Sequence, residues 1–115
     1  MAISPSVVGD LLPVWAIHIV DSEDGVTPID LTGGTAVSLR FEPNAEAGGT
    51  GTPFTGAGLA AITLPATAGI ISYALGASDV VAGNAGPWLV WPTVTFPGGT
   101  RTFNPIPWTL VQRPA

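Results

Sequence analysis

The densest group of residues that could do chemistry is acidic and lies in the N-terminal third of the chain. It contains four carboxylates in a polar turn region, Asp21, Glu23, Asp24 and Asp30. Hard cations such as calcium take several oxygen ligands from loops of this kind. The spacing misses the helix–loop–helix calcium pattern, because Gly25 stands where a ligand is needed and no glutamate closes the loop. We interpret these side chains as solvated turn carboxylates and predict no metal and no other cofactor.

A second candidate for chemistry is His18, the only histidine in the chain. Nucleophilic catalysis needs a serine and an orienting acid around such a base, but the neighbours of His18 are Ile17 and Ile19 on a predicted strand. Glu42 and Glu46 are a possible carboxylate pair for glycoside hydrolysis. They lie only four residues apart, at a strand end and in a glycine-rich loop. We therefore predict that the protein is not an enzyme.

The tryptophans offer a third kind of chemistry, because an aromatic face can stack on the apolar face of a sugar. There are four of them, Trp15, Trp88, Trp91 and Trp108. All four lie in predicted strands and not in loops, which favours core packing and protein interfaces, where tryptophan is enriched. Carbohydrate binding stays open as an alternative. No glycine-rich loop opens a helix, so the sequence contains no phosphate cradle.

The charge of the chain excludes nucleic acid as its main ligand. The net charge is −5, lysine is absent, and the only cations besides His18 are Arg40, Arg101 and Arg113. Proteins that bind DNA or RNA neutralise phosphates with clustered lysine and arginine. Three scattered arginines form no such patch.

The composition is unusually poor in charge for a small domain. Of the 115 residues, 46% are hydrophobic and only 10% are charged, against about 25% in typical globular proteins. This favours a surface that other subunits partly cover, although Thr, Ser, Asn and Gly could solvate it instead. No run of residues approaches the about 20 apolar residues of a membrane span, residues 1–12 lack the basic region of a signal peptide, and no cysteine is present.

The elements that would position these residues are organised around a hairpin over residues 86–104. Its first strand, Trp88 to Phe96, is rich in residues that suit a pleated, half-buried surface, and Pro97-Gly98-Gly99 provides the turn. Alternation places two sets on opposite faces: Trp88, Val90, Val94 and Phe96 against Leu89, Trp91, Thr93 and Thr95. Both faces carry large apolar groups, so we expect a central strand or one covered by a partner. Pro92 marks an edge or a bulge.

Other strands are predicted on both sides of this hairpin, over residues 11–21, 35–42, 59–64, 70–75 and 108–112. Trp15, Ile17 and Ile19 should share one face of the first of these strands. A glycine-rich loop fills residues 43–55, and residues 76–86 form a loop or one helical turn that Ser78 can cap. The total of seven or eight short strands predicts an all-β sandwich. We expect an N-terminal arm over residues 1–10 and a single β-sandwich domain over residues 11–115.

The order of these features carries a resemblance to a known family. Its segments are the loop with Gly25 and Pro28, Asp30-Leu31-Thr32-Gly33, Val37 to Phe41, Gly69 to Tyr73, Ala82 to Gly86, Trp88 to Trp91, Val94 to Phe96, Pro97-Gly98-Gly99, Arg101 to Pro105 and Trp108 to Val111. In this order the chain resembles the N-terminal immunoglobulin-like domain of bacteriophage baseplate upper proteins and related small tailed-phage proteins. The resemblance covers about residues 11 to 112.

The resemblance implies an immunoglobulin-like β-sandwich of seven or eight short antiparallel strands that attaches parts of a virion to one another. It brings no catalytic residues. We expect a structural protein of the tail, baseplate or neck, located in the virion and assembled in the host cytoplasm. The alternatives are a capsid decoration protein and a carbohydrate-binding or adhesion module on the virion surface. The expected partners are other virion proteins and copies of the chain itself, with a host glycan as a further alternative and no membrane.

The expected interface lies on the face of the central strand that is not required to form the core. We predict that Leu89 and Trp91, on the second face of this strand, form contacts with a partner together with Arg101. The glycine-rich region over residues 43–58 and the arm over residues 1–10 are expected to become ordered on assembly.

Overall fold

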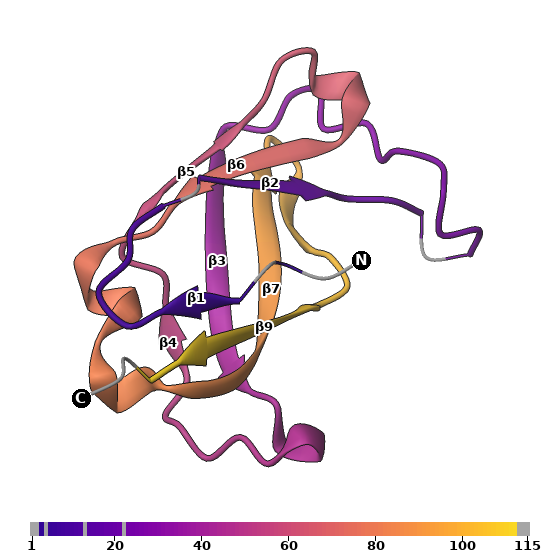
Figure 1. Cartoon of the computed structure of the whole chain (residues 1–115). Coiled ribbons are helices and arrows are strands. Elements are labelled where there is room, and N and C mark those ends of the chain that lie inside the picture. Colours follow the sequence, from indigo (N-terminus) through magenta and orange to yellow (C-terminus); the bar gives the residue numbers. More distant parts are fainter. Residues whose placement is uncertain (1–2, 4, 13, 22, 113–115) are drawn as a thin grey trace.

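The chain forms two β-sheets that pack face to face around one hydrophobic core (Figure 1). This arrangement is seen in a computed structural model that describes residues 3, 5–12, 14–21 and 23–112. The larger sheet has six strands and the smaller sheet has three. The predicted all-β sandwich is therefore confirmed at the level of architecture.

The described part of the chain contains nine strands and no α-helix. The strands are β1 (Ser6–Val7), β2 (Trp15–His18), β3 (Ala36–Pro43), β4 (Phe54–Thr55), β5 (Leu59–Ile62), β6 (Ile70–Ala74), β7 (Gly86–Phe96), β8 (Gly99–Thr102) and β9 (Ile106–Val111). Short 3-10 helices lie between them at Ala45–Ala47, Ala66–Ala68, Ala77–Val80 and Ala82–Asn84. The strand count exceeds the predicted seven or eight because β1 and β4 have only two residues each and leave no periodic pattern.

Strand β7 is the central strand of the large sheet, as predicted for this stretch. The sheet has the order β1-β9-β7-β3-β4, and β8 pairs with β7 as well. On one edge, β7 pairs with β9 as far as Val90 and with β8 from Thr93 onward. Pro92 lies at this interruption, where its carbonyl accepts a hydrogen bond of 2.9 Å from the Phe103 N–H. A proline, which has no backbone N–H, fits at this position because neither the β7–β9 pairing nor the β7–β8 pairing needs a hydrogen-bond donor there.

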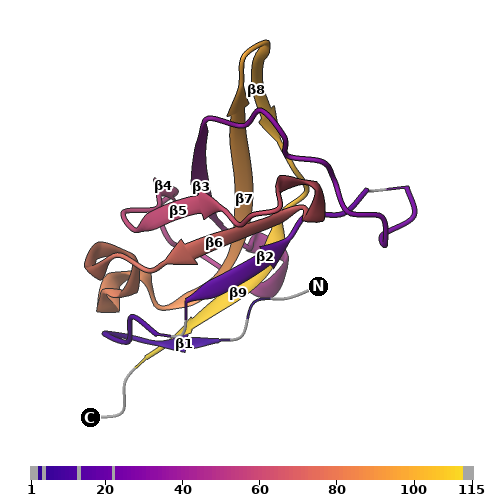
Figure 2. The same ribbon diagram turned by 90° about the horizontal axis from the view of Figure 1, so that it is seen from above.

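The small sheet has the order β2-β6-β5, with both pairs antiparallel. It lies across the large sheet, and the β7–β8 hairpin projects beyond it (Figure 2). The predicted inward faces are confirmed in both layers. Trp15, Ile17 and Ile19 are buried in the β2 region, and Leu39 and Phe41 are buried in β3.

An aromatic cluster joins the two sheets across the core. The ring of Trp15, on the small sheet, lies 5.4 Å from that of Tyr73 and 5.1 Å from that of Trp108 on β9. The ring of Phe54 stacks on that of Phe41 at 4.7 Å. Such pairs each add about 0.5–1.5 kcal/mol beyond the burial of their area. Phe54 thereby anchors β4 within a segment that the sequence predicts to be only loop.

The N-terminal segment contributes to the large sheet. Ser6–Val7 pairs with β9 in parallel register, so the expectation that all strands are antiparallel is wrong for this pair. Ser6 is buried, and its hydroxyl accepts a hydrogen bond of 3.2 Å from Trp108 Nε1. The division into an arm over residues 1–10 and a sandwich over residues 11–115 stays a prediction, and residues 1, 2, 4, 13, 22 and 113–115 lie outside the described residues.

A buried carboxylate, Asp79, ties together the loops that precede and follow strands β5 and β6. Its Oδ1 accepts a hydrogen bond of 2.8 Å from the Ala57 N–H, and its Oδ2 accepts one of 2.9 Å from the Gly76 N–H. The Tyr73 hydroxyl donates to Oδ2 of Asp79 and accepts from the Gly58 N–H at 2.9 Å. Burial and, next, this bond to Asp79 raise the pKa of Tyr73 well above its ordinary value.

The predicted cap of the 3-10 helix Ala77–Val80 is wrong. The N-cap position is taken by Gly76 and not by Ser78. The Asp79 side chain, at the third position of this helix, accepts a hydrogen bond from the N–H of the N-cap residue Gly76, which is the contact that an acidic residue makes at this position of a capping box.

Candidate interaction surfaces

The outer side of the large sheet presents mostly hydroxyl-bearing and apolar side chains. We name this surface the large-sheet face; it consists of Ser38, Arg40, Glu42, Leu89, Trp91, Thr93, Thr95, Thr100, Thr102, Pro107 and Thr109. Strand pairing places Arg40 opposite Trp91 and Glu42 opposite Leu89. In β3, β7 and β9 these positions alternate with buried core residues, so their side chains point away from the core. The two β8 positions, Thr100 and Thr102, pair with outward-facing Thr95 and Thr93 of β7.

Trp91 lies at a shallow hollow in this face. The hollow has a volume of about 330 Å³ and is lined by Trp91 together with Arg40, Glu42, Thr93 and Thr102. The indole is partly exposed, but its Nε1 is shielded from solvent and has no hydrogen-bond partner among the described residues. Because the N–H edge is turned into the protein, the part of the ring that faces solvent is carbon.

The charged groups beside Trp91 are available to a partner. Arg40 is exposed and Glu42 is partly exposed, and neither side chain is in an ion pair or a hydrogen bond with any described residue. The hydroxyls of Thr93 and Thr102 lie 3.3 Å apart and share a hydrogen bond. The hollow therefore combines aromatic carbon, one cation, one carboxylate and two hydroxyls.

The structure separates the three residues predicted to form an interface. Leu89 and Trp91 share the large-sheet face, as the alternation predicts. Arg101 pairs with Val94, whose side chain is buried, so Arg101 lies on the opposite side of the sheet. Its guanidinium carbon lies 4.9 Å from the centre of the Phe103 ring. The sequence could have predicted the side of Arg101. A hairpin that turns at Pro97–Gly99 pairs Arg101 with Val94, so the two side chains lie on the same side of the sheet.

A second surface, which contains no Asp, Glu, Lys or Arg, covers the outside of the small sheet. We name it the small-sheet face; it consists of Ala16, His18, Leu59, Ala61, Ile70, Ser72 and Ala74. Leu59 is 82% exposed, and His18 is the only titratable side chain in this set. Sequence reasoning missed this surface, although the outward positions of β5 and β6 already read as small and apolar residues.

The acidic loop uses its carboxylates to hold its own backbone. Asp21 Oδ1 accepts a hydrogen bond of 2.8 Å from the Glu23 N–H, and Asp30 Oδ1 accepts one of 2.9 Å from the Thr32 N–H. Asp24 Oδ1 accepts from the N–H groups of Val26 and Thr27, both at 2.9 Å. The Thr27 hydroxyl and these backbone donors lower the pKa of Asp24 to about 2. No group of three or more His, Cys, Asp or Glu residues placed for a metal ion occurs in the described ranges.

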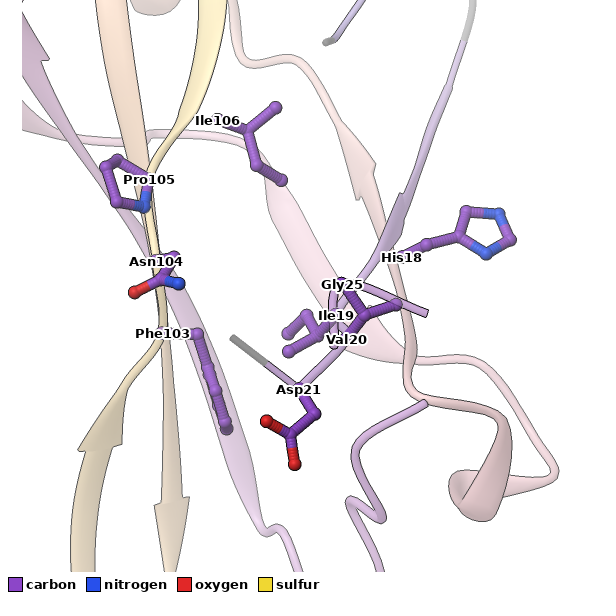
Figure 3. Close-up of a pocket in the computed structure, with 9 residues that line it drawn as sticks. All are labelled: His18, Ile19, Val20, Asp21, Gly25, Phe103, Asn104, Pro105 and Ile106. Atoms are coloured by element: carbon purple, nitrogen blue, oxygen red, sulfur yellow. The ribbon is translucent and has the colours of Figure 1, made fainter. Parts of the chain in front are cut away.

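A hollow between the end of β2 and the link from β8 to β9 is shown in Figure 3. It has a volume of about 210 Å³, and its lining contains a single carboxylate, Asp21, with Phe103 and Ile106 on the facing wall. The His18 ring points away from this space and lies apart from Asp21 (Figure 3). A base and an acid that diverge in this way do not form a catalytic pair.

Comparisons with known proteins do not assign this chain to a family. No family model, curated protein sequence or solved structure matches this chain. Within the described ranges, no helix is both long and apolar enough to cross a lipid bilayer.

Proposed function

We propose that this chain is a non-enzymatic structural protein of a tailed-phage virion that works through protein–protein assembly in the tail, baseplate or neck. The proposal includes an immunoglobulin-like topology. If β2 to β7 are taken in order as strands B, C, C′, D, E and F, with β9 as strand G, the sheet orders read B-E-D and G-F-C-C′. Those are the neighbours found in variable-type immunoglobulin domains, which agrees with the family that the sequence resembles.

The observation that carries the proposal is the scarcity of charge on the two sheet faces. The large-sheet face holds one arginine and one glutamate, and the small-sheet face holds no carboxylate and no arginine. Of the other carboxylates in the described residues, Asp79 is buried, Glu46 lies in the 3-10 helix Ala45–Ala47 and the rest lie in loops. Leu59, on the small-sheet face, is 82% exposed. Faces with few charges and exposed apolar side chains are typical of surfaces that a partner covers.

Purified particles provide the test of this proposal. Virions banded on a density gradient from a lysate of the host that carries this gene should contain the protein at a fixed copy number per particle, measured by quantitative mass spectrometry. A second gradient at high salt should leave that copy number unchanged, because specific assembly contacts are more resistant than electrostatic adsorption. Finding the protein only in the soluble fraction would contradict the proposal. A fixed copy number confined to capsids without tails would instead identify a capsid decoration protein.

The hollow at Trp91 supports carbohydrate binding as a second candidate function. A partly exposed indole beside hydroxyl groups and two charges that pair with no described residue suits the apolar face and the hydroxyls of a sugar. Titration with host-surface glycans, followed by tryptophan fluorescence in the native protein and in Trp91→Ala, checks this candidate. A response that disappears in the variant supports it, and a native protein without a response contradicts it.

A further inference from the structure

We propose that the large-sheet face pairs with the same face of a second copy about a two-fold axis, so that Arg40 of each copy lies opposite Glu42 of the other. This inference rests on the proposed assembly function and names one partner for it. It also gives Leu89 and Trp91 a shared role at the centre of the contact.

The charges on β3 make the face complementary to itself. Arg40 and Glu42 are two positions apart on the same strand, which separates their side chains by about 7 Å on one face. In a two-fold contact, residue i of one copy meets residue j of the other and the reverse holds as well. One cation and one carboxylate on each copy thus form two opposite-charge pairs, and neither charge is paired with a described residue of its own chain.

The same arrangement explains how an acidic protein could associate with itself. The whole chain carries a net charge of −5, which opposes most contacts between copies. Arg40 and Glu42 are the only charged side chains of the large-sheet face and cancel each other. Copies that meet through this face keep the loop carboxylates Asp24 and Asp30 away from the contact, because those side chains do not belong to it.

The large-sheet face is also the more extensive of the two faces. The four strands that carry it have 8, 11, 4 and 6 residues, which at about 3.3 Å per residue and about 4.8 Å between strands give a flat area of the order of 450 Å². Side-chain relief increases the accessible area above this value, toward the about 800 Å² per partner of a standard interface. The small-sheet face, with three strands of four or five residues, covers only of the order of 200 Å². This difference favours the large-sheet face as the surface for a second copy.

Charge reversal tests the pairing in the intact protein. Light scattering coupled to size-exclusion chromatography should give a dimer for the native chain. Arg40→Glu and Glu42→Arg should each be monomeric under conditions where the native chain is dimeric, with dissociation constants raised about tenfold or more, because each reversal sets like charges against each other. The double variant Arg40→Glu/Glu42→Arg should be a dimer again. An equimolar mixture of the two single variants should form a 1:1 heterodimer.

Matched controls keep the result specific. Glu46→Arg and Arg101→Glu make the same changes of net charge at exposed positions outside the large-sheet face, and they should leave the dimer intact. Circular dichroism spectra that match the native protein verify that each variant is folded. A native chain that stays monomeric up to millimolar concentration overturns the inference, and so does a mixture of single variants that does not associate. A monomer that binds glycan through Trp91 also overturns it.

The failure of this inference is distinguishable from the failure of the proposed function. A monomeric chain that is present in purified virions at fixed copy number rejects the two-fold pairing and leaves the assembly function standing. A dimer that is absent from virions rejects the assembly function and leaves the pairing standing.

Discussion

A single carboxylate, Asp79, holds two loops of the sandwich in place. It lies fully inside the protein and accepts hydrogen bonds from two backbone N–H groups and from the Tyr73 hydroxyl. Removal of the side chain would leave those donors without partners in a region closed to water. Unpaired buried donors are among the costlier defects in a folded protein.

We therefore expect Asp79→Ala to lower the free energy of unfolding by about 3–5 kcal/mol. Tyr73→Phe, which removes one hydroxyl and keeps the ring in the core, should cost about 1–3 kcal/mol. Urea unfolding at pH 7, followed by tryptophan fluorescence, measures both values. The double variant should cost clearly less than the sum of the two, because both side chains belong to one hydrogen-bonded network. Strict additivity would argue against that network.

The contribution of Asp24 to the stability of the folded state should depend on pH. Its pKa is lowered from 3.8 to about 2 by the Thr27 hydroxyl and by backbone N–H donors. A carboxyl with a lowered pKa stabilises the folded state above the unfolded value, so this contribution is fully present above pH 3.8 and is lost as the pH falls through about 2. An NMR titration should show the low pKa, and Thr27→Val should raise it toward 3.8. An unchanged pKa in Thr27→Val would contradict the assignment of the hydroxyl as the main cause.

At the scale of elements, the segment that leads into β5 lies in close contact with the backbone at the end of β6. A Cβ added at Gly58 would lie 1.8 Å from the Ala74 carbonyl oxygen and 2.8 Å from the Gly76 backbone nitrogen. Neither neighbour is a flexible side chain, so the backbone itself would have to move. Gly58 is thus required where the segment that enters β5 passes the end of β6.

Gly58→Ala should therefore lower the free energy of unfolding by about 2–3 kcal/mol. Gly83→Ala is the matched control, because a Cβ at Gly83 meets nothing within 4 Å, and it should change stability by less than about 0.5 kcal/mol. Thermal and urea unfolding of the two variants side by side check this contrast. Equal effects at the two positions would show that helix or loop propensity, and not backbone contact, determines the cost.

Strand alternation predicted the elements that have a long buried face. The inward sets of β2, β3 and β7 follow from apolar residues at every second position, since one side of each strand meets the core. The two-residue strands β1 and β4 leave no such pattern, because pairing with a neighbour and contacts such as those of Ser6 and Phe54 define them. Their position depends on residues distant in the sequence.

Local alternation predicts only part of the candidate interface. Leu89 and Trp91 share a face through local alternation alone. Local alternation does not extend to Arg101, because its side depends on the hairpin register, which pairs it with inward-facing Val94. The self-complementary placement of Arg40 and Glu42 next to Trp91 required the pairing of β3 with β7, which is a long-range contact.

At the scale of the whole molecule, the two candidate surfaces lie on opposite sides of one sandwich. The described chain extends over 45 × 26 × 22 Å, with one sheet on each side of the core (Figure 2). A protein of this form can hold a second copy on the large-sheet face and still present the small-sheet face to a different partner. The dimer experiment therefore tests the large-sheet face, whereas the virion experiment tests whether the protein is part of the particle, and each can succeed without the other.

The parallel pairing of β1 with β9 has a mechanical consequence. Backbone hydrogen bonds from Ile3 to Pro107 at 3.1 Å and from Val8 to Val111 at 3.0 Å flank the pairing. A tensile force applied ahead of β1 and behind β9 acts along both strands in opposite directions. It loads these bonds in shear, all at once, and does not peel them open one by one. Such a force would have to break several of these backbone hydrogen bonds together before β1 separates from β9.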